Sequence, residues 1–234
     1  MIFGKGIGFQ KANKILTKKL KKVLNNKSNI PYNNTYLDQY TYKSKQFYIN
    51  WVETEKIGLF TLINFNKKYY SSFISRFYLE MKNKSKVPDY IKKLKQIWDQ
   101  RDILIIEGEK SRLGIGNDLF NNSKSIKRII CPAENAFNVY DKIINQVKIF
   151  DKSFLILLAL GPTSTVLAYD LYLLGYQAID IGHIDIEYEW FLRKATKKIQ
   201  ISSKYVNEVP GNRYRIGKVK DKKYYEEIVS KILN

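Results

Sequence analysis

Two acidic residues separated by a single residue, Asp185 and Glu187, form the pair in this sequence best suited to metal chemistry. They follow an apolar run, 177–181, in a segment that also holds Gly182 and His183. Alternate residues of an extended or turning segment face the same way, so both carboxylates are expected to converge on one cation. Carboxylates suit Mg²⁺ or Mn²⁺, which bind through one or two of them together with substrate phosphates. The alternative is two solvated acids at the start of the next helix, where the helix dipole favours them.

Four side chains near predicted strand ends are candidates for moving a proton: Asp180, His183, Glu107 and Glu109. His183 is the single histidine, and its place after a strand and before the acidic pair favours a site role about as much as a structural one. Glu107 and Glu109 suit a base or a group around a metal, and the alternative is that they form ion pairs with neighbouring basic side chains. Which of the four acts as the base depends on their positions relative to the substrate.

A turn rich in hydroxyl side chains joins a predicted strand directly to a helix. Backbone N–H groups and the helix dipole at such a helix N-terminus attract phosphate, and the hydroxyls are further donors. The alternative is an ordinary helix cap, since Ser and Thr are favoured caps for local reasons. The turn lacks the Gly-Lys-Ser/Thr ending of a Walker A loop and the spaced glycines of a dinucleotide fingerprint, which disfavours a plain NAD enzyme. The candidate phosphate-binding residues are Gly161, Pro162, Thr163, Ser164 and Thr165.

The elements that position these residues are short apolar strands alternating with helices. The strands are predicted at 103–106, 127–131, 154–160 and 177–181, and helices at 135–147 and 166–174. Such alternation implies a mostly parallel sheet with helices on both faces, an α/β Rossmann-like core. Ligands of open parallel sheets bind beyond the carboxyl ends of the strands. Further candidate ligand-binding residues follow the first or fourth strand: Gly108, Ser111, Arg112, Gly114, Gly116, Asn117, Asp118 and Gly182.

The remaining sequence is expected to belong to the same domain, 1–234. Its N-terminal part, 1–90, is helical and aromatic, with an amphipathic helix over 12–24, a loop over 25–34 and helices around 51–63 and 69–81. The core is placed at 91–200 and starts with a short helix over 90–100. Residues 201–234 are expected to form a C-terminal tail and helix.

Composition excludes several classes of protein. Among 234 residues there is one Cys, which excludes an internal disulfide framework, and one His, which excludes multi-histidine zinc sites. The N-terminus has no signal-peptide pattern, and the most apolar run, 154–160, is far shorter than the roughly 20 residues that span a membrane. The sequence therefore predicts a soluble, cytoplasmic protein.

The net charge of +19 comes from 41 Lys and Arg against 22 Asp and Glu. Such a charge attracts polyanions, including nucleic acid and anionic lipid, and would allow peripheral contact with the inner face of a membrane. The favoured explanation is a genome rich in Lys and Asn codons. No standard nucleic-acid-binding motif is present and the lysines spread over several segments, so nucleic acid is disfavoured as a partner.

Two long blocks, 99–140 and 154–191, resemble the core signature of the GT-D type bacterial glycosyltransferases. The first reads DQRDILIIEGEKSRLGIGNDLFNNSKSIKRIICPAENAFNVY and the second FLILLALGPTSTVLAYDLYLLGYQAIDIGHIDIEYEWF. The resemblance implies a Rossmann-like domain that transfers a hexose from a UDP-sugar donor to a glycan or glycoprotein acceptor. It also implies that Asp185 and Glu187 hold Mn²⁺ or Mg²⁺ against the donor diphosphate. The turn at 161–165 and the glycines after Glu109 would shape the donor pocket.

One element of the family pattern is not matched. Family members carry an Arg-(Phe/Tyr)-Gly-Asp-Gly-Glu element ahead of a stretch resembling GKGIGFQK, which is found here at 4–11. The leading hypothesis is a metal-dependent glycosyltransferase acting on a protein-borne or cell-surface glycan. The alternatives are a basic nucleic-acid-binding protein, and a degenerate glycosyltransferase fold that binds nucleotide without turnover.

Overall fold

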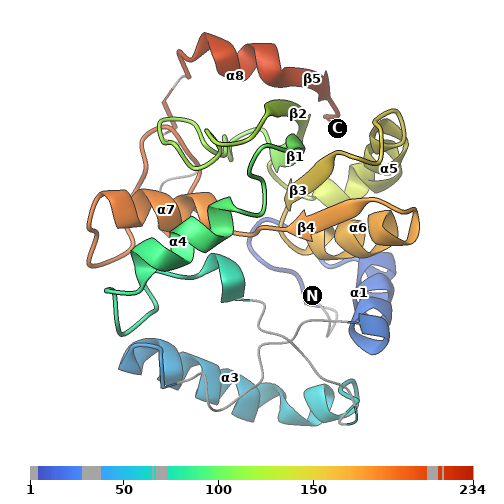
Figure 1. Ribbon diagram of the computed structural model, residues 1–234. Coiled ribbons are helices and arrows are strands. Elements are labelled where there is room, and N and C mark those ends of the chain that lie inside the picture. Colours follow the sequence, from blue (N-terminus) through green and yellow to red (C-terminus); the bar gives the residue numbers. More distant parts are fainter. Residues whose placement is uncertain are drawn as a thin grey trace.

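The computed structural model describes residues 5–27, 38–64, 66, 73–209, 216–217 and 219–233. Its centre is a five-stranded sheet in which every strand pairing is parallel (Figure 1). The strand order is β4-β3-β1-β2-β5. The strands are β1 (Asp102–Gly108), β2 (Ser125–Cys131), β3 (Leu155–Ala159), β4 (Gln177–Asp180) and β5 (Ile228–Lys231). The predicted α/β fold with a parallel sheet is therefore confirmed.

Strand β1 is central, and its side chains divide the core into two layers. Ile103 and Ile105 belong to one cluster of buried residues, while Leu104 and Ile106 belong to the other. Alternate residues of a strand point to opposite faces, so a strand buried on both sides must be apolar throughout. This is why the apolar run ILII at 103–106 could be recognised as a strand from the sequence.

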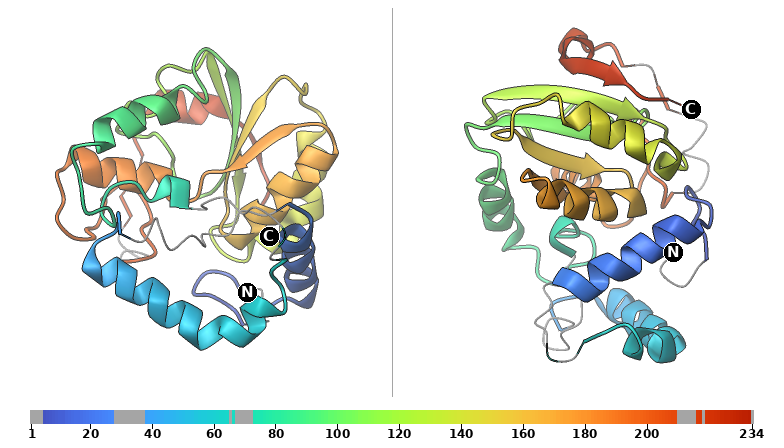
Figure 2. Two further views of the ribbon diagram at one scale, coloured as in Figure 1. Left: turned by 60° about the horizontal axis from the view of Figure 1, so that its bottom comes forward. Right: turned by 90° about the vertical axis from the view of Figure 1, so that its right-hand side faces the viewer.

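Helices cover both faces of the sheet (Figure 2). One core cluster includes residues of α1 (Lys14–Lys27), α5 (Tyr140–Val147) and α6 (Pro162–Leu173). The other includes residues of α4 (Val87–Lys95) and α7 (Ile184–Leu192). The sheet is thus buried between two helical layers, as the sequence predicts.

Three elements differ from the expected ones. The prediction of a helix over 69–81 is wrong for the described residues 73–81. They form a short 3₁₀ turn, η1 (Phe73–Ser75), followed by an irregular segment. Residues 69–72 lie outside the described part. Helix α7 begins at Ile184, where an extended or turning segment was expected, so the acids lie at the start of a helix as in the alternative, although they are buried and not solvated. The C-terminal part contains β5 after α8 (Lys222–Glu227), and β5 extends the sheet beyond the predicted core.

The N-terminal part contributes one packed and one separate helix. Helix α1 packs against α6, and Lys19 Nζ lies 2.7 Å from Asp170 Oδ2. Helix α3 (Tyr42–Phe60) lies apart from the sheet, and none of its described side chains is buried (Figure 1). A 3₁₀ turn, η2 (Ala136–Val139), precedes α5. None of the described helices combines the length and the apolar character needed to cross a membrane.

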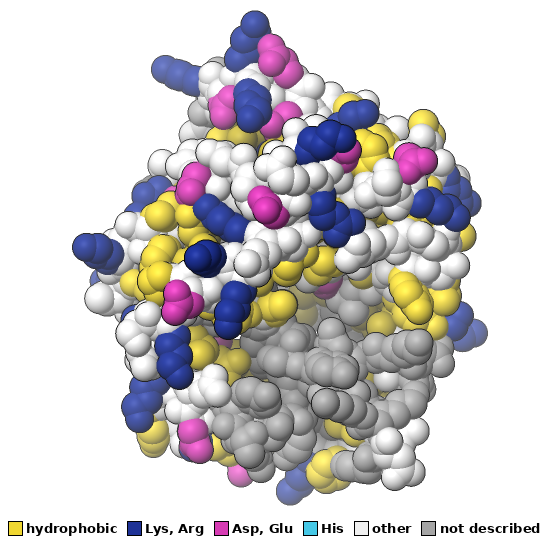
Figure 3. Space-filling model, in the orientation of Figure 1, with side chains coloured by type: hydrophobic (Ala, Val, Ile, Leu, Met, Phe, Trp, Pro, Cys, Tyr) yellow, Lys and Arg dark blue, Asp and Glu magenta, His cyan; other side chains and the backbone are white. Residues whose placement is uncertain are grey.

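Basic side chains are scattered over the face of the molecule that Figure 3 shows, with acidic ones among them. A nucleic-acid groove needs basic groups gathered along one track. The described side chains on the visible face form no such track.

Candidate functional site

The order of the strands indicates where a ligand should bind. The chain passes from β1 to β2 on one side, then crosses back to place β3 on the other side of β1. In open α/β sheets, ligands bind at the carboxyl ends of the strands where the order reverses in this way. A cleft lies at this point, and residues that follow all four strands from β1 to β4 line it, including Gly108, Pro132, Gly161 and Gly182.

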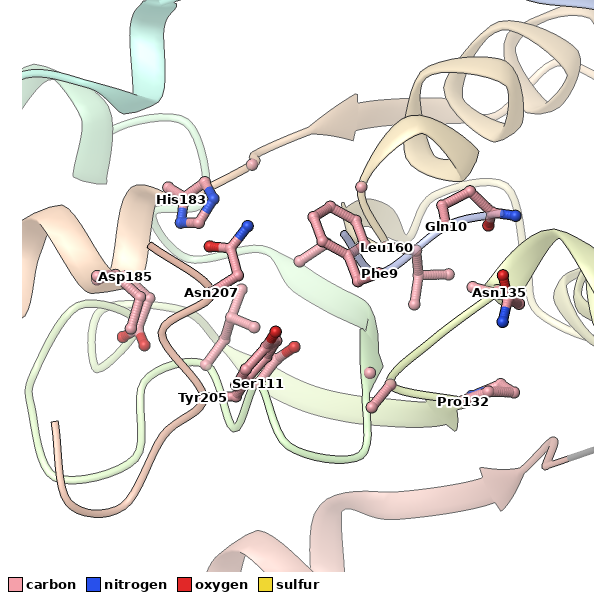
Figure 4. A pocket seen from close by; sticks show the side chains of 18 residues that line it. Phe9, Gln10, Ser111, Pro132, Asn135, Leu160, His183, Asp185, Tyr205 and Asn207 are labelled. Atoms are coloured by element: carbon pink, nitrogen blue, oxygen red, sulfur yellow. The ribbon is translucent and has the colours of Figure 1, made fainter. Parts of the chain in front are cut away.

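One end of the cleft is apolar (Figure 4). The ring of Phe9 lies beside Leu160 there, and Pro132 lines the same end. The segment that carries Phe9 is held against the loop after β2, because Asn135 N donates to Phe9 O (2.9 Å) and Lys11 N donates to Asn135 Oδ1 (2.7 Å). This end therefore combines a flat aromatic ring with a nearby amide side chain.

Gly161 allows the Phe9 ring to approach the backbone. Its φ is +58°, and a Cβ added there would lie 2.2 Å from Phe9 Cε2. Residues with a side chain rarely adopt this backbone conformation, and the Phe9 ring leaves no room for a side chain at position 161. Gly161 is also the residue before α6, so the helix begins at the cleft wall.

The opposite end of the cleft is polar. Its labelled side chains in Figure 4 are Ser111, His183, Asp185, Tyr205 and Asn207. Burial, and to a smaller extent the nearby Arg76 guanidinium, lowers the pKa of His183 to about 4. The imidazole is therefore neutral at physiological pH.

Asp185 lines the cleft, yet both of its oxygens are hydrogen-bonded by protein groups. Gly114 N and Asn117 Nδ2 each donate to Oδ1 at 2.9 Å. The Nζ of Lys204 lies 2.7 Å from Oδ2, and this lysine side chain is fully buried. In Figure 4 the carboxylate points away from His183.

Glu187 faces a different part of the molecule. Its Oε2 accepts hydrogen bonds of 3.0 Å from Tyr78 N and Leu79 N, and its Oε1 lies 3.9 Å from Arg76 Nη1. The expectation that it shares a face with Asp185 is wrong, because both lie in helix α7, where residues two apart point about 200° apart. The described residues contain no group of three or more His, Cys, Asp or Glu that could hold a metal. The residues present do not fit a cation held by Asp185 and Glu187 together.

Glu107 is fully buried below the cleft and does not line it. Its Oε1 lies 2.7 Å from Arg128 Nη1, and its Oε2 accepts from Leu113 N at 2.7 Å. Burial raises the pKa of Glu107, and the Arg128 charge opposes that shift. Glu107 is therefore in an ion pair, as the structural alternative expects, but the expected partners Lys110 and Arg112 are wrong for it and the partner is Arg128. Glu109 is exposed and is not among the lining residues.

The polar stretch after β1 divides into lining and supporting residues. Gly108 and Ser111 line the cleft. Arg112 Nη1 donates to Ser203 O (2.8 Å) and Gly217 O (2.6 Å), and Asp118 accepts from Lys95 and Tyr188. Gly114, Gly116 and Asn117 do not line the cleft; they line a separate hollow beside α8.

The hydroxyls after Gly161 serve local structure. Ser164 Oγ accepts from Leu160 N at 2.6 Å, and Thr165 Oγ1 donates to Asp180 Oδ2 at 2.9 Å. Thr163 is buried, with no hydrogen-bond partner for Oγ1. Pro162 occupies the first turn of α6. Of the turn, Gly161 alone is among the lining residues.

Asp180 stands beside the cleft and is not among its lining residues. Besides Thr165, it accepts a hydrogen bond of 3.1 Å from Gly182 N. Burial raises its pKa to about 6, and these hydrogen bonds oppose the shift. Of the four candidate proton carriers, His183 is the one that the structure places on the cleft wall.

Sequence reasoning missed the residues that reach the cleft from distant parts of the chain. These are Phe9, Gln10, Pro132, Asn135, Leu160, Tyr205 and Asn207. The stretch at 4–11 was noticed only through its resemblance to family members, and no local pattern marks 205–207. Their role depends on contacts between segments far apart in sequence, which periodicity does not reveal.

Comparison with known proteins adds to this geometry. The family described as "Glycosyltransferase GT-D fold" matches residues 1–209. The "Probable glycosyl transferase Gly" of Streptococcus gordonii is 51% identical over 140 residues, covering 60% of this chain and 20% of that protein. "Glycosyltransferase GlyD" of Streptococcus pneumoniae serotype 4 is 44% identical over 166 residues, covering 71% and 20%. The chain thus spans about a fifth of the length of these curated relatives.

Solved structures match over nearly the whole chain. One is described as "The highly conserved domain of unknown function 1792 has a distinct glycosyltransferase fold"; its TM-score is 0.93 at 37% identity, covering 100% of this chain and 85% of that one. Another, "A New Glycosyltransferase (DUF1792) from Streptococcus sanguinis", has a TM-score of 0.93 at 36% identity, covering 99% and 88%.

Proposed function

Because the chain belongs to the GT-D fold family of glycosyltransferases, we propose that it transfers a hexose from a UDP-sugar to a glycan acceptor on a protein or a cell-surface polysaccharide. The observation that carries this proposal is the cleft at the reversal of strand order, with one apolar and one polar end. A nucleotide sugar has the same division, since its base is flat and its diphosphate and hexose are polar.

We place the base at the Phe9 end. The ring of Phe9 gives a flat apolar surface, and the Asn135 side chain at the same end provides amide groups for the polar edge of a pyrimidine. The diphosphate then lies near the first residue of α6, where the helix dipole favours an anion. The hexose reaches the end lined by Ser111, His183 and Asn207.

The reaction needs a group that accepts a proton from the acceptor hydroxyl. As the acceptor oxygen bonds to the anomeric carbon, UDP leaves with the electrons of the broken C–O bond, and the hydroxyl proton must be removed. We assign this proton to His183, because its imidazole is the one among the four candidate proton carriers that lies on the cleft wall.

The acceptor has a separate groove available. It lies between α3 and residues 196–198 and is lined by hydroxyl, basic and aromatic side chains, including Ser44, Phe47, Tyr48 and Lys198. Arg76 and Glu208, which also line it, are close enough to His183 for their charges to affect its pKa, so the groove lies near that residue. Aromatic rings beside polar groups suit a sugar chain.

The proposal is tested with two aromatic variants. Phe9→Ala should weaken UDP binding at least tenfold in calorimetric titration, because the base loses its stacking surface. Phe47→Ala should bind UDP as the parent protein does, yet release less UDP when a UDP-hexose and an acceptor glycan are supplied. No UDP binding by the parent protein would contradict the proposal, and binding without turnover for any UDP-hexose would favour the degenerate alternative.

A further inference from the structure

A buried lysine lies beside Asp185, one of the two residues expected from the sequence to hold a cation. Lys204 Nζ lies 2.7 Å from Asp185 Oδ2 and 2.9 Å from Glu189 Oε1, and its side chain has no exposed surface. Asp185 and Glu189 are four residues apart on α7, so they lie on one face of the helix, whereas Glu187 lies on another. The acids that converge are therefore 185 and 189, and the cation between them is an ammonium group.

The charges and hydrogen bonds of this cluster are complete without a metal. Arg193 Nη2 lies 3.0 Å from Glu189 Oε2, so two carboxylates face two cationic side chains. Asn117 Nδ2 donates to both Asp185 Oδ1 (2.9 Å) and Glu189 Oε1 (2.8 Å). A divalent ion that took the place of the ammonium at Asp185 Oδ2 would remove one of the two carboxylate partners of a fully buried lysine, which is unfavourable.

The cluster also holds a segment of the cleft wall. Lys204 is followed by Tyr205 and Asn207, which line the polar end of the cleft. On the same segment, Tyr205 N donates to Lys110 O at 2.8 Å, and Ser203 O accepts from Arg112. Among these contacts of the segment, the ion pair between Lys204 and Asp185 of α7 is the one that joins two oppositely charged, buried side chains.

We propose that Asp185 is a positioning residue that fixes residues 201–209 on the donor cleft through Lys204, and that it binds no divalent cation. The inference rests on the proposed function, because it assumes that the cleft binds UDP. It predicts that donor binding depends on the Asp185–Lys204 pair and not on a metal at Asp185.

The test uses Asp185→Asn, which preserves shape, and Lys204→Met, which preserves length, with Glu187→Gln as the matched acid outside the cluster. UDP affinity is measured by calorimetry in EDTA and again in Mn²⁺. We expect the parent protein to bind equally, within twofold, in both. Asp185→Asn and Lys204→Met should each weaken binding at least tenfold in both solutions, and the double variant should be no weaker than the worse single variant. Glu187→Gln should resemble the parent.

Direct Mn²⁺ titration followed by electron paramagnetic resonance, together with hydrogen exchange of residues 201–209, supplies readouts independent of UDP. Faster exchange of that segment in both cluster variants, with no Mn²⁺ site removed by Asp185→Asn, supports the proposal. It is overturned if EDTA abolishes UDP binding by the parent and Asp185→Asn removes a Mn²⁺ site. If the parent binds no UDP in either solution, the proposed function fails, while the exchange and Mn²⁺ measurements still decide the role of Asp185. If Lys204→Met does not fold, Asp185→Asn alone decides it.

Discussion

At the scale of single residues, the cleft depends on one glycine and one phenylalanine that are far apart in sequence. Gly161 has a φ of +58° and the ring of Phe9 lies where its Cβ would be. The backbone conformation and the contact each exclude a side chain. Gly116 has a comparable φ of +79° but has open space around it, so the two glycines separate these two effects.

Gly161→Ala should therefore cost more than Gly116→Ala. We expect about 1 kcal/mol of backbone strain for Gly116→Ala and at least about 2 kcal/mol for Gly161→Ala, because its new methyl group also displaces Phe9. Only Gly161→Ala should weaken UDP binding. Denaturant unfolding and calorimetry measure the two effects, and equal values for the two variants would disprove the steric role of Phe9.

The pH dependence of His183 is a second prediction at this scale. Its pKa in the folded protein is about 4, below the ordinary value of 6.5. As the pH falls from 6.5 towards 4, the unfolded chain binds a proton that the folded chain does not, so the neutral histidine's contribution to stability is lost in that window. The melting temperature of the parent should fall more steeply there than that of His183→Gln. A parallel fall in both proteins would contradict the lowered pKa.

At the scale of elements, Arg128 connects the two central strands to the end of the chain. From β2 its guanidinium pairs with Glu107 of β1 and with Glu227 of α8, at 2.7 Å in each case. The pairs are buried, so removing one partner leaves a charge without compensation. This arrangement gives Glu107 a structural role in the sheet.

Glu107→Gln should destabilise the protein by about 3 kcal/mol without changing the UDP affinity of the folded molecules. The matched control is Glu226→Gln, which removes an exposed pair with Lys222 and should change stability by less than about 0.5 kcal/mol. Unfolding curves and calorimetry at a temperature where both variants are folded provide the comparison. A large loss of UDP affinity in Glu107→Gln would instead indicate that Glu107 takes part in donor binding.

Elements differ in how far the sequence determined them. β1 was predictable because burial on both faces requires an unbroken apolar run. Helix α7 was not, because all residues from Ile184 to Trp190 are buried, acids included, which erases the polar face that marks a helix. β5 has half-exposed or exposed residues throughout and depends on pairing with β2, about a hundred residues earlier. The strand ends were therefore predicted better than the residues that complete the site.

At the scale of the whole molecule, the net charge is +19, and on the face that Figure 3 shows the basic side chains are scattered among acidic ones. We propose that this charge allows weak contact with an anionic membrane surface, where lipid-linked or nascent glycans would be found. Scattered charges act through the long-range field, which salt screens over about 8 Å at physiological ionic strength.

Binding to vesicles should therefore be weak and sensitive to salt. We expect cosedimentation with vesicles containing anionic lipid at low ionic strength, loss of most binding at physiological salt, and none with neutral vesicles. A mixed-sequence oligonucleotide should lose its binding in the same way. Binding to either partner that survives at high salt would indicate a specific surface.

The joining of Phe9 to Asn135 also affects the order in which the protein is made. These contacts link residues more than 120 positions apart. At a synthesis rate of 5–20 residues per second, the N-terminal segment waits about 6–25 s on the ribosome before the loop that receives it has been translated. The cleft cannot close before that loop has been made, so the Phe9 ring is available to chaperones and proteases during that interval.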